Sequence, residues 1–535
     1  MKYSHNPKKA DLYIRSAKFK SKLHMNKVIK FYLFCLLFFL SSKPSFGMAI
    51  NDTTAIVAGK AKITGSIIRP NNANKDSIFV NINVPHPISG DYAKYKALVD
   101  QSGKFSIDVD VETVVCLTGF SVSLNPEKFL IVKLTNAGVT NVNITYNEDN
   151  NIKNIDVIPA MNQYDMTEGL VAQGKAFDYR SGKKAEPLYN KSTDYFLSYA
   201  KTDLSKRLEI VNNDTLISKE LKGILSKDLR LYIYSLLVFD YENKMIFNYK
   251  ETNGVFNNKN SDQIKIPHIQ KIDRTYFRFL KDFNLNDTEY LQCFNFLEFQ
   301  KVFLQNETLN LPKIVDSDIP SWLKNVKAIL ADLVGFDNGQ YYDILVANAY
   351  ALQLNEELKP LTEKQKENIK KYWKNGEIAK ILFRKNQQVI EFDKFKSPAV
   401  VNDVSSVPDN KVIETIIAKH KGKVVLIDLW ATWCGPCLEA MQQFRSTKGN
   451  FHDKDVAFVY LTNESSPRKQ WEEKIKGIGD EHYYLKGAQW EYIMNQFEFE
   501  YIPSYLLYNK EGVLINKFQA FPGSDKVKVM INGLL

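Results

Sequence analysis

The chain has 535 residues, of which 44% are apolar and 25% charged, and its formal net charge is +10 at pH 7. This composition is typical of globular domains with true hydrophobic cores, and the length predicts about three to four domains. The charge is unevenly distributed, because residues 1–47 contain ten Lys or Arg and one acid, which leaves the remainder nearly neutral. The composition therefore excludes a basic nucleic-acid-binding surface as the explanation of the net charge.

Residues 1–47 have the pattern of a secretory signal peptide. A Lys-rich segment precedes a run of apolar residues at 31–40, and small or polar residues follow as far as Gly47. This run is too short for a membrane-spanning helix, which takes about 20 residues, but it suits a cleaved signal. We therefore expect export to the periplasm or cell envelope, with a retained N-terminal anchor as the alternative. Translation from Met25 would give a leader of more usual length.

Four cysteines follow this leader: Cys116, Cys293, Cys434 and Cys437. So few cysteines in an exported chain exclude a fold held together by disulfides. Cys116 lies in an apolar, strand-like run and Cys293 in an aromatic, helix-like run, so both are predicted to be buried, unreactive thiols that do not bridge. Cys434 and Cys437 form a Cys-x-x-Cys pair, which carries the chemistry discussed below.

The segment 48–162 alternates apolar and polar residues, as in 77–84 and 105–111, with a hairpin turn at 100–103. Many short strands with Gly, Asn and Pro between them predict an N-terminal antiparallel β-sandwich domain. His86 lies between two prolines, and we interpret it as a solvated loop residue.

The segment 163–392 changes to a helical period and predicts an α-helical middle domain. Apolar residues between 221 and 236 fall on one helical face, and Asn212-Asn-Asp214 before them resembles a helix cap. Pro320 and Gly335 are the expected start and end of another helix. Thr362 and Gln365 form a capping-box pattern ahead of a third. The aromatic residues of this segment are interpreted as core.

The segment 393–535 alternates strands and helices and predicts a C-terminal α/β domain with a central mixed sheet. A shift to Lys, Ser, Pro and Asp in 392–410 marks the approach to it. The expected strands are 424–429, 456–461, 483–485, 504–508 and 513–518, and the expected helices are 436–447, 468–476 and 488–497, with a short helix at the terminus.

The apolar run 424–429 leads directly into Cys434 and Cys437 at the start of the helix 436–447. A cysteine at a helix N-terminus faces unpaired backbone N–H groups and the positive end of the helix dipole, which favour the reactive thiolate. The two-residue spacing places both sulfurs on one turn, close enough for a disulfide. We expect the first sulfur to be exposed and the second covered.

The motif Trp430-Ala-Thr-Trp-Cys-Gly-Pro-Cys437, together with Ile502-Pro503, resembles the TlpA/ResA-like thiol-disulfide oxidoreductases of the thioredoxin superfamily. The resemblance covers about a quarter of the chain. It implies a thioredoxin-like fold for 393–535 and a redox-active Cys434–Cys437 pair in place of any bound cofactor.

The resemblance also implies a role for each residue of the motif. Cys434 corresponds to the attacking thiolate and Cys437 to the resolving thiol, while Asp428 corresponds to the buried acid that takes the proton of Cys437. Pro503 corresponds to the cis-proline that faces the dithiol. The residues implied in substrate contact are Trp433, Gly435, Pro436, Ile502 and Pro503.

Three positions depart from the family pattern. Leu438 stands where a basic residue is usual, Ala440 where many ResA-like proteins have Glu, and Gln442 where a proline often kinks the helix. Asp428 is therefore the candidate base. In the family, Cys-Gly-Pro-Cys goes with a reducing potential, about −270 mV against about −120 mV for a strong oxidant of the same fold.

Other uses of the cysteine pair fail on the surrounding residues. A zinc site needs four ligands, and His452 and His482 belong to no second paired motif. A c-type haem attachment needs His at 438, where Leu stands. A peroxiredoxin needs Thr at 431, where Ala stands. We expect no metal.

Two functions remain. The first is an enzyme, a protein-disulfide reductase acting on disulfides of exported proteins and supplied by an upstream membrane or soluble electron donor. The second is an envelope binding or interaction protein in which the thioredoxin-like domain is secondary or regulatory. An intact dithiol with Asp428 and Pro503 favours the enzyme, because a disused site need keep none of them.

Overall fold

The computed structural model describes residues 56–69, 77–180, 185–254, 267–394 and 397–535. The predicted signal peptide at 1–47 lies outside these ranges. In the described part of the chain, no helix combines the length and the apolar character needed to cross a membrane. The chain divides into two compact units. The N-terminal unit comprises the described residues up to 351 together with 362–383, and the C-terminal unit comprises 352–361 and 384–535.

The N-terminal unit begins with eight strands: β1 (Ile56–Ile68), β2 (Phe79–His86), β3 (Asp91–Leu98), β4 (Lys104–Thr113), β5 (Val115–Val122), β6 (Asn125–Thr135), β7 (Val139–Tyr146) and β8 (Ile152–Ile158). They form two sheets of order β4-β1-β7-β8 and β3-β2-β5-β6. The rings of Phe105 and Phe120, one from each sheet, lie 5.9 Å apart, so the sheets face each other across an apolar core. The predicted pattern is antiparallel, but β1 and β7 pair in parallel.

His86 is the last residue of β2 and is buried, so the prediction of a solvated loop residue is wrong. Pro85 does not end the strand there, since β2 pairs with β5 only over residues 80–83 and at Pro85 only with β3. A proline without a ladder partner on one side loses no hydrogen bond. His86 lies 3.5 Å from Asp91 Oδ1 and 3.9 Å from Glu112 Oε1.

The rest of the N-terminal unit is helical, with α2 (Gln163–Phe177), α3 (Thr193–Asn212), α4 (Lys219–Ile233), α5 (Tyr241–Thr252), α6 (Phe296–Gln305), α7 (Ile319–Val334), α8 (Gln340–Glu356), α9 (Glu363–Trp373) and α10 (Glu377–Asp393). A π-helical turn, Tyr234–Val238, follows α4, and 3-10 turns occupy Arg274–Phe283 and Thr288–Gln292. The last turn of α8 and most of α10 belong to the C-terminal unit.

The predicted helix ends have mixed outcomes. Thr362 and Gln365 make the expected capping box, and α7 begins with proline in its first turn and ends at Gly335, whose φ is 86°. The cap predicted at 212–214 is wrong, because α4 is capped by the Ser218 side chain. Asp214 instead accepts hydrogen bonds from the backbone N–H groups of residues 216 and 217, which closes a turn.

The C-terminal unit is built on one six-stranded sheet of order β14-β13-β10-β11-β12-β9. Its elements are β9 (Ala399–Asn402), α11 (Val412–Lys419), β10 (Val424–Leu429), α12 (Gly435–Lys448), β11 (Val456–Asn463), α13 (Arg468–Ile478), β12 (Asp480–Leu485), α14 (Gly487–Gln496), β13 (Ser504–Tyr508), β14 (Leu514–Gln519) and α15 (Ser524–Asn532). β9 to β12 run parallel, and β13 and β14 are antiparallel to their neighbours. The mixed sheet and the predicted elements from 424 to 519 are confirmed, with small shifts at their ends.

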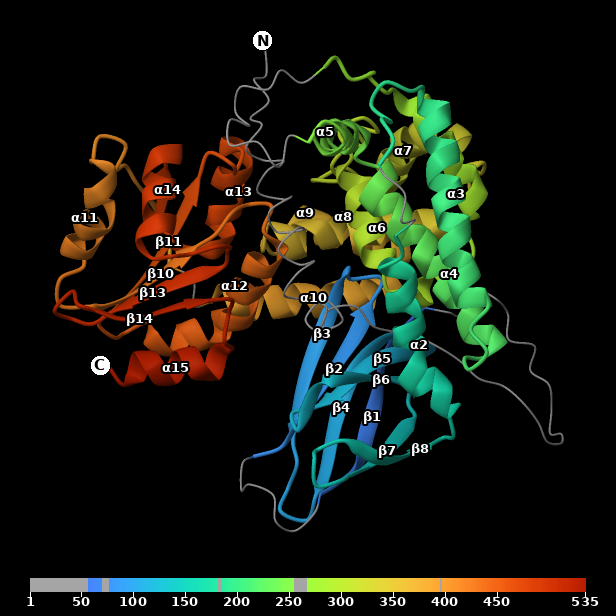
Figure 1. The fold of residues 1–535 in the computed structure, drawn as a ribbon, viewed down its shortest axis with the longest axis horizontal. Helices are drawn as coiled ribbons and strands as arrows, with labels where there is room; N and C mark the ends of the chain where they lie inside the picture. The colour runs from blue at the N-terminus through green and yellow to red at the C-terminus, as the bar shows by residue number, and fades with distance from the viewer. Residues whose placement is uncertain (1–55, 70–76, 181–184, 255–266, 395–396) are drawn as a thin grey trace. The chain divides into compact units, whose positions relative to one another are not determined.

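Two apolar cores cover the two faces of this sheet. One contains residues of α11 and α14, and the other contains residues of α12, α13 and α15. Figure 1 shows α14 and α15 on opposite sides of the sheet. β10 lies between β11 and β13 and is buried at all six positions, so every side chain it carries must enter one core or the other.

Candidate active site

β10 places Asp428 in an apolar core for a geometric reason. Successive side chains of a strand point to opposite faces, so Val425, Ile427 and Leu429 enter the core of α11 and α14. Val424 and Leu426 enter the core beneath α12 instead, and Asp428 falls on their face of the strand. Its carboxyl is therefore buried, with the residue 6% exposed.

Burial raises the pKa of Asp428 well above its ordinary range, because a charged carboxylate loses its hydration there. The Tyr505 hydroxyl and the Lys448 ammonium both lower the pKa of Asp428, but burial has the larger effect. Oδ1 of Asp428 has no hydrogen-bond partner in the described part of the chain. A buried acid with a raised pKa and an unused oxygen is suited to taking up and releasing a proton.

Cys434 and Cys437 are joined by a disulfide, with their Cα atoms 5.3 Å apart. Cys434 is the N-cap residue of α12, and its sulfur accepts a hydrogen bond from the Cys437 N–H at 3.2 Å. Pro436 occupies the first turn of α12, where its missing N–H would have had no helical partner. The sequence thus puts both sulfurs at the positive end of the helix dipole.

The expectation of an exposed first sulfur is wrong for this disulfide form. Cys434 is 3% exposed and Cys437 fully buried, because the bond draws the first sulfur onto the second. The surface around the disulfide consists of Trp433, Gly435 and Pro436, which are all exposed. These are three of the residues that the motif predicts to contact substrate.

The other two, Ile502 and Pro503, precede β13. Their peptide bond is cis, as the resemblance predicts. Ile502 packs against the core cluster that contains both cysteines, so the loop and the disulfide belong to one site. Ser504 donates a hydrogen bond to the Tyr501 carbonyl at 2.6 Å, and the Pro503 carbonyl accepts one from Ala520 N–H at 2.9 Å.

The loop after β11, which contacts the dithiol segment, was not predicted from the sequence. Ser466 accepts a hydrogen bond from the Thr432 N–H at 3.0 Å, and Ser465 accepts one from the Trp433 indole at 3.1 Å. Asn463 in turn accepts from Ser465. A signal was available, because loops at the carboxyl ends of neighbouring parallel strands meet at the same sheet edge.

The buried charged groups beneath α12 were not predicted from the sequence either. Lys448 is buried and forms an ion pair with Asp480, and it donates to the Ile478 carbonyl at 3.1 Å. His482, which we did not favour as a zinc ligand, is fully buried with Nε2 2.8 Å from the Gly479 carbonyl. In the described part of the chain no group of three or more metal-ligating side chains occurs.

Comparison with known proteins agrees with this geometry. Residues 398–528 match the Redoxin family, which defines the C-terminal unit as a thioredoxin-like redoxin domain. Thioredoxin from Coprinus comatus is 28% identical over 70 residues, which are 13% of this chain and 66% of that protein. The chain thus spans slightly less than two thirds of the length of this relative.

Solved structures similar to the chain include thiol-disulfide oxidoreductases and thioredoxins. StoA from Bacillus subtilis is 21% identical, with 20% of this chain and 82% of that chain covered and a TM-score of 0.18. The thioredoxin domain of a thiol-disulfide oxidoreductase from Bacteroides vulgatus is 19% identical, with 22% and 84% covered and a TM-score of 0.20. The exposed lipoprotein thioredoxin Etrx1 from Streptococcus pneumoniae is 19% identical, with 22% and 90% covered and a TM-score of 0.19.

Proposed function

We propose that this protein is an exported thiol-disulfide oxidoreductase that reduces disulfides of other exported proteins. The observation that carries the proposal is the Cys434–Cys437 disulfide at the N-terminus of α12, in a domain that also buries Asp428 and presents a cis-proline loop. The match of residues 398–528 to the Redoxin family supports thiol-disulfide chemistry of the thioredoxin type.

The reaction starts from the reduced dithiol. The Cys434 thiolate attacks one sulfur of the substrate disulfide, and the other substrate sulfur leaves with the electron pair and takes up a proton. Cys437 then gives its proton to Asp428, and its sulfur attacks Cys434 in the mixed disulfide. The Cys434–Cys437 bond forms, the bond to substrate breaks, and the second substrate sulfur leaves as a thiolate that is protonated by Asp428 or water. Two electrons pass to the substrate.

Regeneration of the dithiol needs a thiol-based electron donor, either a membrane protein or a soluble one. Reduction is the direction favoured by the Cys-Gly-Pro-Cys sequence, which goes with a low potential in this fold. Export is supported by the basic and apolar pattern of residues 1–47, which fits a secretory signal. Trp433, Gly435, Pro436 and the loop at Ile502 and Pro503 form the proposed substrate surface.

Insulin reduction with dithiothreitol as the electron donor tests the activity. We expect the mature protein to accelerate the reaction and Cys434→Ser to abolish the acceleration. Cys293→Ser is the matched control, since this free thiol is buried and its pKa is raised well above the ordinary value by burial. Equal rates for the wild type and Cys434→Ser would rule out the proposed activity.

Cys437→Ser separates the enzyme from a binding protein. Without the resolving thiol, the mixed disulfide between Cys434 and substrate should persist and can be isolated from the native envelope. Recovery of covalently bound exported proteins that dithiothreitol releases supports the enzyme. Partners that bind equally well to the Cys434→Ser, Cys437→Ser double variant would favour an interaction protein.

A further inference from the structure

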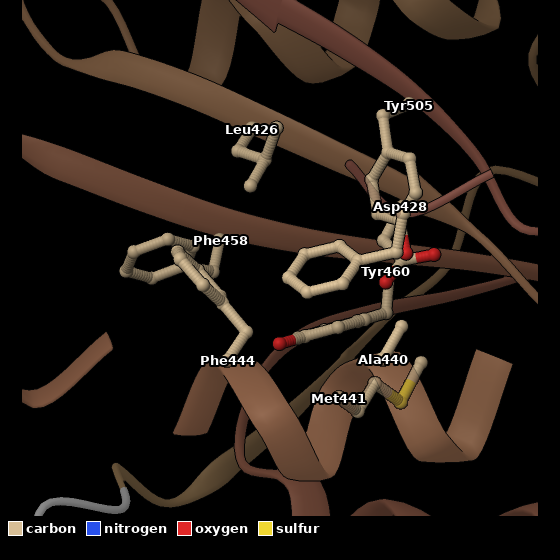
Figure 2. A pocket seen from close by; sticks show the side chains of 9 residues that line it. Leu426, Asp428, Ala440, Met441, Phe444, Phe458, Tyr460 and Tyr505 are labelled. Atoms are coloured by element: carbon tan, nitrogen blue, oxygen red, sulfur yellow. The ribbon is translucent and has the colours of Figure 1, made fainter. Parts of the chain in front are cut away.

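A row of polar and aromatic side chains crosses the sheet of the C-terminal unit beneath α12. Asp428 on β10 is paired with Tyr460 on β11 and with Tyr505 on β13, and the row continues to His482 and Phe518. Residues paired across neighbouring strands point to the same face. Two phenols therefore flank the Asp428 carboxyl, and Figure 2 shows the three side chains gathered at one side of a cavity.

The two tyrosines differ in their hydrogen bonds. The Tyr460 hydroxyl accepts a hydrogen bond from the Lys448 ammonium at 3.5 Å. The Tyr505 hydroxyl and Oδ1 of Asp428 are both buried, and neither has the geometry of a hydrogen bond with a described residue. The two side chains are nevertheless near enough for Tyr505 to lower the pKa of Asp428. Buried polar atoms are almost always hydrogen-bonded, so two unsatisfied groups on adjacent strands indicate a partner shared between them.

The cavity beside these groups has a volume of about 20 Å³ and is lined by Asp428, Tyr460, Tyr505, Ala440 and Met441, among others. Ala440 comes from α12 and contributes only a methyl group, which leaves the space open. A buried water needs roughly 10–15 Å³ and two to four polar partners. The carboxyl and the two hydroxyls supply such partners.

We propose that Tyr505 is a positioning residue for Asp428. The Tyr505 hydroxyl donates a hydrogen bond to one water in this cavity, and this water donates to the Asp428 carboxylate, which receives the Cys437 proton. The proposal rests on the proposed function. It assigns to Tyr505 the task of stabilising the charged form of Asp428, so that the carboxyl can act as a base when the mixed disulfide is resolved.

The Lys448 ammonium also favours the charged form of Asp428. Lys448 and Arg445 approach from α12, and Lys448 is held in an ion pair with Asp480 and in a hydrogen bond to the Ile478 carbonyl. The Arg445 guanidinium lowers the pKa of Tyr460, which burial raises. Burial raises the pKa of Asp428, and Tyr505 lowers it, as expected of a hydrogen-bond donor that stabilises the charged carboxylate.

Single-turnover reduction of insulin by the reduced protein, followed from pH 5 to 9, tests the proposal. Tyr505→Phe removes the donor and favours the protonated carboxyl, so the acid limb of the resolving rate should move to higher pH. We expect a loss of about tenfold at pH 7 and recovery towards the wild-type rate at high pH. Tyr508→Phe is the matched control, because Tyr508 is buried on the same strand but in the opposite core.

Ala440→Val tests the water separately, since it fills the cavity and leaves the Tyr505 hydroxyl in place. It should displace the pH profile in the same direction, and it keeps the proposal testable if Tyr505→Phe fails to fold. In the Asp428→Asn background, Tyr505→Phe should have no further effect. The proposal is overturned if Tyr505→Phe leaves the profile unchanged or lowers the rate equally at every pH. An unchanged profile in Ala440→Val overturns the bridging water. If the wild type itself does not reduce insulin, the proposed function fails instead.

Discussion

Buried carboxyl groups of the two units are hydrogen-bonded to different degrees. In the N-terminal unit, Glu112 accepts hydrogen bonds from the N–H groups of Ile88 and Ser89 at 2.7 and 3.0 Å and from the Ser89 hydroxyl at 2.6 Å. His86 lies against it. In the C-terminal unit, by contrast, Oδ1 of Asp428 and Nδ1 of His482 have no partner among the described residues.

Asp228 follows the pattern of the N-terminal unit. It accepts from the Asn295 N–H at 2.7 Å, from the Asn295 amide at 2.6 Å and from the Gln173 amide. Burial raises the pKa of Asp228 to about 7, and these donors limit the rise. Burial alone therefore does not identify a functional acid. A fully bonded carboxyl is the acceptor for several buried donors of the fold, whereas an unsatisfied one in the same core as a redox pair is suited to proton transfer.

The largest expected effect is on Asp228. Asp228→Ala leaves the donors of Gln173 and Asn295 buried without an acceptor, which should lower the free energy of unfolding of the N-terminal unit by about 4 kcal/mol. Hydrogen exchange read by mass spectrometry resolves this unit from the other. Asp332→Ala is the control, because Asp332 is exposed and its ion pairs are with surface Arg278 and Lys281. A loss of unfolding free energy no larger than that of Asp332→Ala would contradict the structural role of Asp228.

His86 and His482, one buried histidine from each unit, should affect stability in opposite pH ranges. Burial lowers the pKa of His86, but Glu112 and Asp91 outweigh it and raise the pKa to about 9. The stability that His86 contributes is complete below its ordinary pKa of 6.5 and is lost as the pH rises through about 9. Burial lowers the pKa of His482 to about 4, so its contribution is complete above pH 6.5 and is lost as the pH falls towards 4.

Each histidine should contribute at most about 3 kcal/mol over its own pH window. NMR titration of the ring protons, assigned with His86→Gln and His482→Gln, measures both pKa values directly. Two histidines that titrate near 6.5 would contradict the contrast between the units.

A smaller effect is expected for Asp428→Asn, and it has the opposite sign to that of Asp228→Ala. The folded state raises the pKa of Asp428, so this carboxyl costs stability at every pH above its ordinary value of 3.8. The substitution should therefore stabilise the C-terminal unit by about 1 kcal/mol at pH 8 and by nothing near pH 3.

The same variant should slow the resolving step more than the first attack by Cys434, because Asp428 acts on the Cys437 proton. The release of substrate from a trapped mixed disulfide measures this step. Destabilisation at pH 8, or an unchanged release rate, would show that Asp428 serves the fold.

The sequence predicted the dithiol, Asp428 and Pro503 because each is a local signal: a motif, an acid in an apolar strand and an Ile-Pro before a strand. It could not predict Tyr460 and Tyr505 as neighbours of Asp428, since their pairing depends on the register of three strands far apart in the chain.

Errors elsewhere have similar causes. His86 between two prolines indicated a loop, and only the one-sided pairing of β2 explains a strand there. Helix α11 lies between the segment 392–410 and the strand at 424 and was not predicted, although Val412, Ile413 and Ile416 form an apolar face that the sequence already contains. The predicted domain boundaries at 47, 162 and 392 remain predictions.

One feature of the C-terminal unit affects how its chain can be divided. Residues 352–361 belong to it, and Glu356 binds Lys474 of α13 through its carboxylate at 3.0 Å and its carbonyl at 3.2 Å. Gly477 lies so close that a Cβ there would be 2.2 Å from the Glu357 carbonyl oxygen. The polypeptide crosses between the units at 351, 361 and 383, so no single cut releases the whole C-terminal unit. During synthesis, the segment 352–361 is made more than seventy residues before Cys434, and its contacts with α13 form only after α13 has been made.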